Sequence, residues 1–191
     1  MTGKHVVLRV LTRRETEFYP EVEVDDAGWG DLVGGVVIGG YNPLNGEFRW
    51  ARVPVRYFQG EAFAGKDYLV GAKRAVNKVL GDLRADKRFH RVAMCTGYVL
   101  NYAARSLRQN GWRVVRRKIE GRCQELVEAT FRRELINLGV PPDLIRSMPS
   151  GTNRFIRLFK WVKEDPEERE RYVKTGWNSW HSKWRSKLWN K

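Results

Sequence analysis

Two adjacent aspartates, Asp25 and Asp26, follow an alternating apolar run in the stretch VEVDDAGWGD (22–31). The alternation of valine with glutamate before the pair predicts a strand with one covered face, so the acids stand at a strand end. Carboxylate oxygens are the ligands that Mg²⁺ prefers, and the glycines after the pair would let a phosphate backbone approach closely. The pair is therefore a candidate for half of a metal site. The alternative interpretation is a polar loop between two strands.

The elements that must position these acids can be predicted from periodicity. Three antiparallel strands in succession are the simplest interpretation of Val22–Phe58, which holds two alternating runs and an NPLNG turn. After them the pattern alternates between helix and strand, which is typical of parallel strands joined by helical crossovers. The predicted segments are a helix over Lys66–Leu83, a strand over His90–Cys95, a helix over Tyr98–Gln109, a strand over Trp112–Glu120 and a helix over Gly121–Leu138.

This order of elements over Tyr19–Leu138 resembles the ribonuclease H-like fold, and the stretch VDDAGWGDLVGGVVIGG (24–40) is similar to the first motif of type 2 ribonuclease H. That motif is an aspartate, a glutamate and then Ala-Gly-Arg-Gly, followed by an apolar strand. The resemblance implies an α/β fold with a ribonuclease H-like mixed sheet, in which an antiparallel three-strand meander joins parallel strands. It also implies a site at the C-terminal ends of the central strands, where two divalent metals clamp the phosphate that is cut.

Carried onto this chain, the resemblance gives a partial acid set. Asp25 matches the first acid and Asp26 the glutamate, whereas Trp29 stands where the motif has arginine. The strand that should end in a second acid ends in MCTGY and has none. The first later acids are Glu120, at the expected end of its strand, and Glu125, in the first turn of the next helix. The resemblance therefore implies a catalytic set of Asp25, Asp26, Glu120 and Glu125, with Mg or Mn held by Asp25, Glu120 and Glu125.

The charge balance points to a polyanionic partner. The chain has a net charge of +14 and a pI of about 10.1, which favours nucleic acid. The alternatives are an arginine-rich composition or the surface ion networks of a thermophile. Positive charge concentrates in Ala103–Lys118 and Arg171–Lys191, which contain no acid. The residues expected to contact nucleic acid are Trp29, Arg105, Arg108, Lys183, Arg185 and Lys187.

The domain organisation expected is a ribonuclease H-like domain at 1–140, with an extra N-terminal strand, and a basic Trp-rich helical extension at 141–191. In the extension, Trp177, Trp180, Trp184 and Leu188 follow helical spacing and form one stripe. Three interpretations of the stripe stay open. It docks on the domain as a satellite core, stacks on single-stranded nucleic acid, or binds a membrane surface or partner protein.

Several classes of protein are disfavoured. No apolar run approaches the roughly 20 residues of a membrane-spanning helix, and no signal peptide is recognisable, so a cytoplasmic protein is expected. Two cysteines without a CxxC pair argue against zinc and against a disulfide framework. Two function hypotheses remain. One is a nucleic-acid-binding nuclease dependent on Mg or Mn, and the other is a non-catalytic RNA-binding or assembly module with a degenerate acid site.

Overall fold

The computed structural model describes residues 19–146 and 152–189. The extra strand expected before residue 19 lies outside these residues. The prolines and Gly151 of GVPPDLIRSMPSG (139–151) predict a linker, and its last five residues also lie outside. Within it, Pro142–Arg146 forms a short helix instead. In the part of the chain that is described, no helix combines the length and the apolar character needed to cross a membrane.

A five-stranded mixed sheet with the order β3-β2-β1-β4-β5 forms the centre of the molecule. The predicted meander is confirmed, because β1 pairs with β2 and β2 with β3 in antiparallel fashion, while β1–β4 and β4–β5 are parallel. The α/β class and the mixed sheet are therefore as expected. The strands are β1 (Glu21–Ala27), β2 (Val36–Asn42), β3 (Glu47–Val53), β4 (Arg91–Met94) and β5 (Arg113–Arg116).

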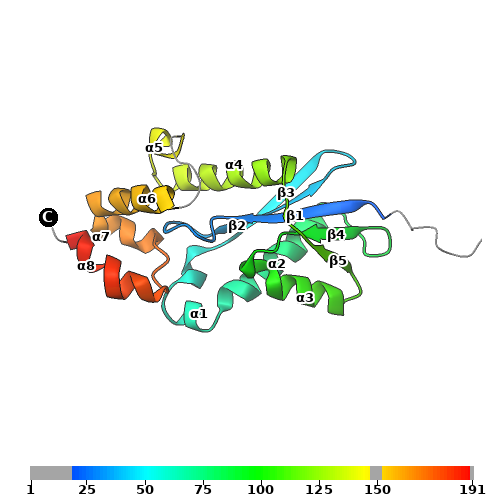
Figure 1. Cartoon of the computed structure of the whole chain (residues 1–191), viewed down its shortest axis with the longest axis horizontal. Helices are drawn as coiled ribbons and strands as arrows, with labels where there is room; N and C mark the ends of the chain where they lie inside the picture. The colour runs from blue at the N-terminus through cyan, green and yellow to red at the C-terminus, as the bar shows by residue number, and fades with distance from the viewer. Residues whose placement is uncertain (1–18, 147–151, 190–191) are drawn as a thin grey trace, which may run out of the picture.

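Helices cover both faces of this sheet (Figure 1). On one face, Val22 and Val24 of β1 pack in a core with α2 (Asp67–Asp82) and α3 (Asn101–Gln109). On the other, Val37 and Ala93 pack with α4 (Arg122–Asn137). The alternation of side chains along each strand thus builds two cores. Smaller elements are α1 (Gly60–Ala64) and the 3₁₀ turns Val55–Phe58 and Tyr98–Leu100.

The chain after residue 141 shares the second core. It forms α5 (Pro142–Arg146), α6 (Thr152–Glu164), α7 (Pro166–Arg169), a 3₁₀ turn (Glu170–Tyr172), a π-helical turn (Trp180–Trp184) and α8 (Ser186–Trp189). Trp180 is 1% exposed and Leu188 is 3% exposed, and both pack in the same cluster as α4 and α6. This confirms that the tryptophan stripe docks on the domain, because its central ring lies inside the protein.

Two predicted elements are shorter than expected. The strand predicted over Trp112–Glu120 ends at Arg116, and the following residues up to Glu120 are irregular. The sequence DPEERERYVKTG (165–176) predicts a helix with Asp165 as its N-cap and Gly176 as its stop. This helix does begin as predicted, since the Asp165 side chain accepts a hydrogen bond from the Glu168 amide at 3.3 Å. It ends at Tyr172 rather than near Gly176, because Val173 is buried and forms an antiparallel bridge with Val33.

Candidate functional site

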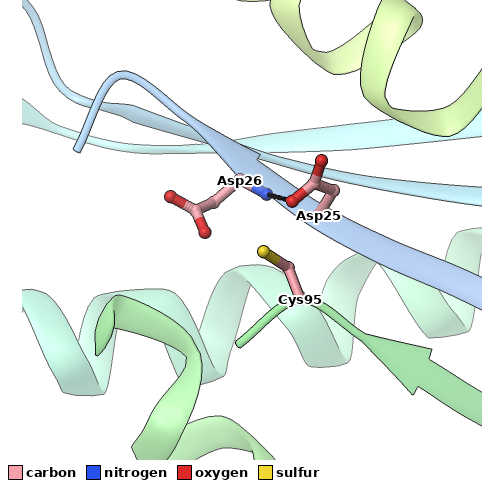
Figure 2. A group of neighbouring side chains, drawn as sticks. All are labelled: Asp25, Asp26 and Cys95. Atoms are coloured by element: carbon pink, nitrogen blue, oxygen red, sulfur yellow. Dashed lines mark hydrogen bonds between the residues drawn. The ribbon is translucent and has the colours of Figure 1, made fainter. Parts of the chain in front are cut away.

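The register of the parallel strands brings the ends of β1 and β4 together. Val24 pairs with Met94, the last residue of β4, so Asp25 and Cys95 are the next residues after the β1–β4 pairing ends, although β1 continues to pair with β2 as far as Ala27. The Cys95 amide donates to the Val24 carbonyl at 2.9 Å. Asp25, Asp26 and Cys95 each offer a ligand atom, and these atoms all lie within 4.8 Å of one another. Among the described residues, this is the one group of potential metal ligands. Figure 2 shows the Cys95 thiol pointing toward the gap between the two carboxylates.

The two aspartates leave the strand on opposite faces, as neighbours in a strand must. Asp25 is 5% exposed. Its carboxylate turns back to accept a hydrogen bond from the Asp26 amide at 2.9 Å. Asp26 lies against Gly97, where an added Cβ would come within 2.6 Å of Asp26 Oδ1. A side chain at Gly97 would therefore displace the Asp26 carboxylate.

The surroundings disfavour charge on both acids. Burial and the neighbouring Asp25 charge raise the pKa of Asp26 to about 7. Burial also raises the pKa of Asp25, although a hydrogen bond from Cys95 opposes this effect. The pKa of the Cys95 thiol is raised to about 11 by burial, so at neutral pH it is a protonated donor. A divalent cation at this point would relieve the cost of two partly desolvated carboxylates.

A pocket of about 230 Å³ adjoins Asp26, and its lining includes two further acids, Asp31 and Glu128, and the buried Arg154. Arg154 of α6 pairs with both carboxylate oxygens of Asp31, with Nη2 to Oδ2 at 2.5 Å, and with Glu128 of α4 at 3.1 Å. The Glu128 charge contributes to the raised pKa of Asp25 and of Asp26. Of the acids on α4, Glu128 is therefore the one whose charge acts on Asp25 and Asp26.

The loop after the pair is anchored from both sides. Lys174 is fully buried and donates to the carbonyls of Gly28 and Asp31, the latter at 2.8 Å. Burial lowers the pKa of Lys174 to about 7. Gly28 has φ of +94°, and a Cβ there would lie 2.4 Å from Phe131 of α4, so only glycine fits. Of the glycines expected to admit a phosphate backbone, Gly28 is covered, whereas Gly30 is exposed and open.

The two later acids of the predicted catalytic set lie outside this group. Glu120 is an exposed side chain paired with Lys118 at 2.5 Å, and Lys118 lowers the pKa of Glu120. Glu125 is exposed and pairs with Arg122 at 3.4 Å. Neither belongs to the cluster of potential ligands in the described part of the chain. Glu120 was expected at a strand end, and β5 ends four residues earlier, so the irregular segment carries it away from the sheet edge.

Sequence reasoning missed the acid and the arginine that meet in the pocket. The i,i+4 spacing from Glu128 to Arg132 predicts a surface pair, yet Glu128 pairs with Arg154 instead. A signal for Arg154 did exist, since it precedes Leu158 and Val162 by four and eight residues on the apolar stripe of α6. A cation within such a stripe indicates a buried ion pair.

The predicted nucleic-acid residues have different environments. Trp29 packs on Phe58, Tyr68 and Tyr98, with ring centroids at 6.1, 5.2 and 5.8 Å, so its faces are engaged by the protein. Arg105 and Arg108 are exposed on α3 and line an open pocket. Contact of any of them with nucleic acid stays a prediction.

The three cations of the tail surround the docked tryptophans. Lys183 and Lys187 lie over the Trp184 ring, at 5.2 and 5.0 Å from its centroid. Arg185 pairs with Glu170 at 2.7 Å. All three are exposed, so an edge of positive charge remains on the outer side of the docked stripe.

No protein-family model matches this chain, and no curated protein matches it in sequence.

Proposed function

We propose that this protein binds nucleic acid through a ribonuclease H-like domain and hydrolyses phosphodiester bonds with Mg or Mn held at Asp25 and Asp26. One observation carries the proposal. Two partly buried carboxylates with raised pKa values stand at the C-terminal edge of two parallel strands, in a protein of net charge +14. Acids whose pKa values are raised by burial and by a neighbouring carboxylate are candidates for a functional site, although the Arg116 and Lys174 charges oppose part of this effect at Asp26.

Two further features support the ribonuclease H-like assignment. The strand order β3-β2-β1-β4-β5, with an antiparallel meander leading into parallel strands, is the arrangement that the resemblance implies. The Asp-Asp-Ala-Gly-Trp-Gly stretch lies at the end of β1, where the first motif of type 2 ribonuclease H would lie. Trp29 departs from that motif, and its ring serves the internal aromatic cluster instead.

The donor set fits a hard cation in part. Asp25 and Asp26 offer oxygen atoms, and Mg²⁺ commonly keeps several waters when one or two carboxylates bind it. Cys95 is protonated at neutral pH and would orient Asp25 by hydrogen bonding rather than bind an oxygen-preferring ion. A bound ion would supply Lewis-acid polarisation of a phosphoryl oxygen and an activated water. Asp26 borders the pocket and would hold the ion there together with Asp25.

The second candidate function is a non-catalytic RNA-binding or assembly module. The observation in its favour is that Arg154 already neutralises Glu128 and Asp31, while Cys95 occupies the strand end where a further acid is expected. In that case the buried ion pairs would only stabilise the loop after β1, and the basic surface alone would carry the function.

Titration calorimetry with Mn²⁺ on the wild type and on Asp25→Asn tests the acid pair, followed by cleavage of labelled RNA and DNA. Asp82→Asn, which removes an exposed acid paired with Lys78 on α2, is the matched control. We expect saturable binding and cleavage in the wild type and control, and loss of both in Asp25→Asn. Wild-type cleavage by Asp25→Asn would refute the proposal. Nucleic-acid binding without ion binding would establish the second candidate function.

A further inference from the structure

A second pocket opens beside the acid pair, on the α3 side of the sheet. Its volume is about 510 Å³, and it is lined by Thr96, Asn101, Arg105, Arg108, Gln109 and Arg116. Three guanidinium groups and three neutral hydrogen-bonding side chains thus surround it, and no carboxylate belongs to its lining. Such a set of donors is complementary to an oxyanion.

The sheet register fixes the position of this pocket relative to the acids. Met94 of β4 pairs with Arg116 of β5, so Arg116 leaves the same sheet edge as Asp26, with the end of β4 between them. Arg116 Nη2 donates to the Gly97 carbonyl at 3.0 Å. The opposite side of Gly97 faces Asp26, since an added Cβ would lie 2.6 Å from Asp26 Oδ1. Gly97 therefore lies beside both Asp26 and Arg116, and its neighbour Thr96 lines the pocket.

The arginines of this pocket are incompletely satisfied by the protein. Arg116 Nε is buried and finds no hydrogen-bond partner within the described residues. In the part of the chain that is described, Arg108 donates to one acceptor, the Val114 carbonyl, at 3.0 and 3.3 Å. Burial and the nearby Arg108 charge lower the pKa of Arg116, whereas the Cys95 and Asp26 charges oppose this effect. The two arginines of the lining therefore repel each other. An anion between them would remove the repulsion and complete the hydrogen bonding.

We propose that the pocket formed by Arg105, Arg108 and Arg116 binds a phosphate group of the nucleic-acid strand whose neighbouring phosphodiester reaches Asp26. The identity of the ligand rests on the proposed nucleic-acid function, whereas the pocket itself does not require metal chemistry. Arginine suits this task because its planar fork donates two parallel hydrogen bonds to phosphate. Thr96 and Asn101 add neutral donors to the lining, and Gly97, which lies beside both Asp26 and Arg116, separates the two sites by a single residue.

The test separates the pocket from the acid pair by working in EDTA. Short fluorescein-labelled RNA and DNA oligonucleotides are titrated by anisotropy at several salt concentrations, and inorganic phosphate is titrated by calorimetry. Arg105→Gln is the main variant, because Arg105 is exposed on α3 and its change leaves the core intact. Arg133→Gln, an exposed arginine of α4, is the control with the same change in charge. Arg116→Gln provides a second variant, with its folding checked by a thermal melt.

The expected result is an affinity for the oligonucleotides about tenfold lower in Arg105→Gln, with the slope of log affinity against log salt reduced by about one. Arg133→Gln keeps the wild-type values, and inorganic phosphate binds the wild type more tightly than Arg105→Gln. If oligonucleotides bind both glutamine variants as they bind the wild type, the pocket assignment fails while the proposed function stands. Binding of inorganic phosphate without any binding of oligonucleotides keeps the pocket but assigns it to a small phosphate ester, and then the proposed function fails. Failure of the wild type to bind either probe overturns both.

Discussion

Asp31 and Arg154 lie 123 positions apart in the chain and form a buried ion pair, in which the guanidinium meets both carboxylate oxygens. Their side chains are 4% and 8% exposed. The pair joins the loop after β1 to α6, so the edge of the acid site is held by the C-terminal extension. The Lys174 hydrogen bonds to Gly28 and Asp31 add a second connection between the same two parts.

Asp31→Asn should therefore destabilise the protein strongly. Removing one partner of a buried pair typically costs about 3–5 kcal/mol in the free energy of unfolding. Glu128, at 3.1 Å from Arg154, still offsets part of the buried charge, so the loss should lie near the lower end of that range. Urea denaturation followed by tryptophan fluorescence measures the loss. Glu168→Gln is the control, because Glu168 pairs with Arg171 at the surface, where such pairs contribute about 0–1 kcal/mol. An equal loss of unfolding free energy in the two variants would show that the buried pair stabilises the protein no more than a surface pair does.

Features that depend on neighbouring residues in the sequence could be predicted, whereas features that depend on residues far apart in the chain could not. Periodicity placed the meander, the crossover helices and Asp25 at a strand end, because these features depend on local alternation and on the direction of parallel strands. The same reasoning failed for Glu120, because the strand ends at Arg116, where its pairing with Met94 ends, and nothing in the following residues RKIE marks that end. The partners of Asp31 and Glu128 come from residues far along the chain, and no local pattern specifies which cation will reach them.

Two tryptophans of the tail should contribute very differently to stability, because one is buried against the domain and the other is exposed. Trp180 is 1% exposed and packs in the core shared with α4, so Trp180→Ala should lower the free energy of unfolding by about 3–5 kcal/mol. Trp189 is 54% exposed, and Trp189→Ala should change it by no more than about 0.5 kcal/mol. Thermal and urea melts measure both. A tail that unfolds without affecting the domain would give small values for both variants and contradict the shared core.

Cys95 stands at the strand end where a further carboxylate would complete the acid set. Cys95→Asp should raise the affinity for Mn²⁺ by about tenfold or more, because coordination of a hard cation strengthens with the number of charged oxygen ligands. Without metal the same variant should be less stable than the wild type, since three acids would then repel one another. Cys95→Ser, which keeps a hydrogen-bond donor and adds no charge, is the control. Calorimetry measures the affinity for Mn²⁺, and thermal melts with and without Mn²⁺ measure the stability. A Cys95→Asp variant that binds Mn²⁺ no better than Cys95→Ser would argue against an ion at this edge.

The raised pKa of Asp26, about 7, makes ion binding depend on pH in a definite direction. Below pH 7 the folded protein keeps a proton on Asp26 that the unfolded chain, with an ordinary aspartate pKa near 3.8, has released. Between these two pH values the free energy of unfolding should therefore fall as pH rises, because the native state binds the extra proton. Mn²⁺ requires the ionised carboxylate, so its affinity should rise by about tenfold per pH unit up to pH 7 and then level off.

Calorimetry at pH 6 in two buffers of different protonation enthalpy should show the release of about one proton per ion bound. In Asp26→Asn both the proton release and the rise of affinity with pH should disappear, since asparagine has no proton to lose. The Asp82→Asn control should keep both, because Asp82 lies on the surface of α2 and pairs with Lys78. An affinity that stays flat between pH 5.5 and 7.5 in the wild type would mean that Asp26 does not titrate on ion binding, and the ion would then have to be bound by Asp25 without its neighbour.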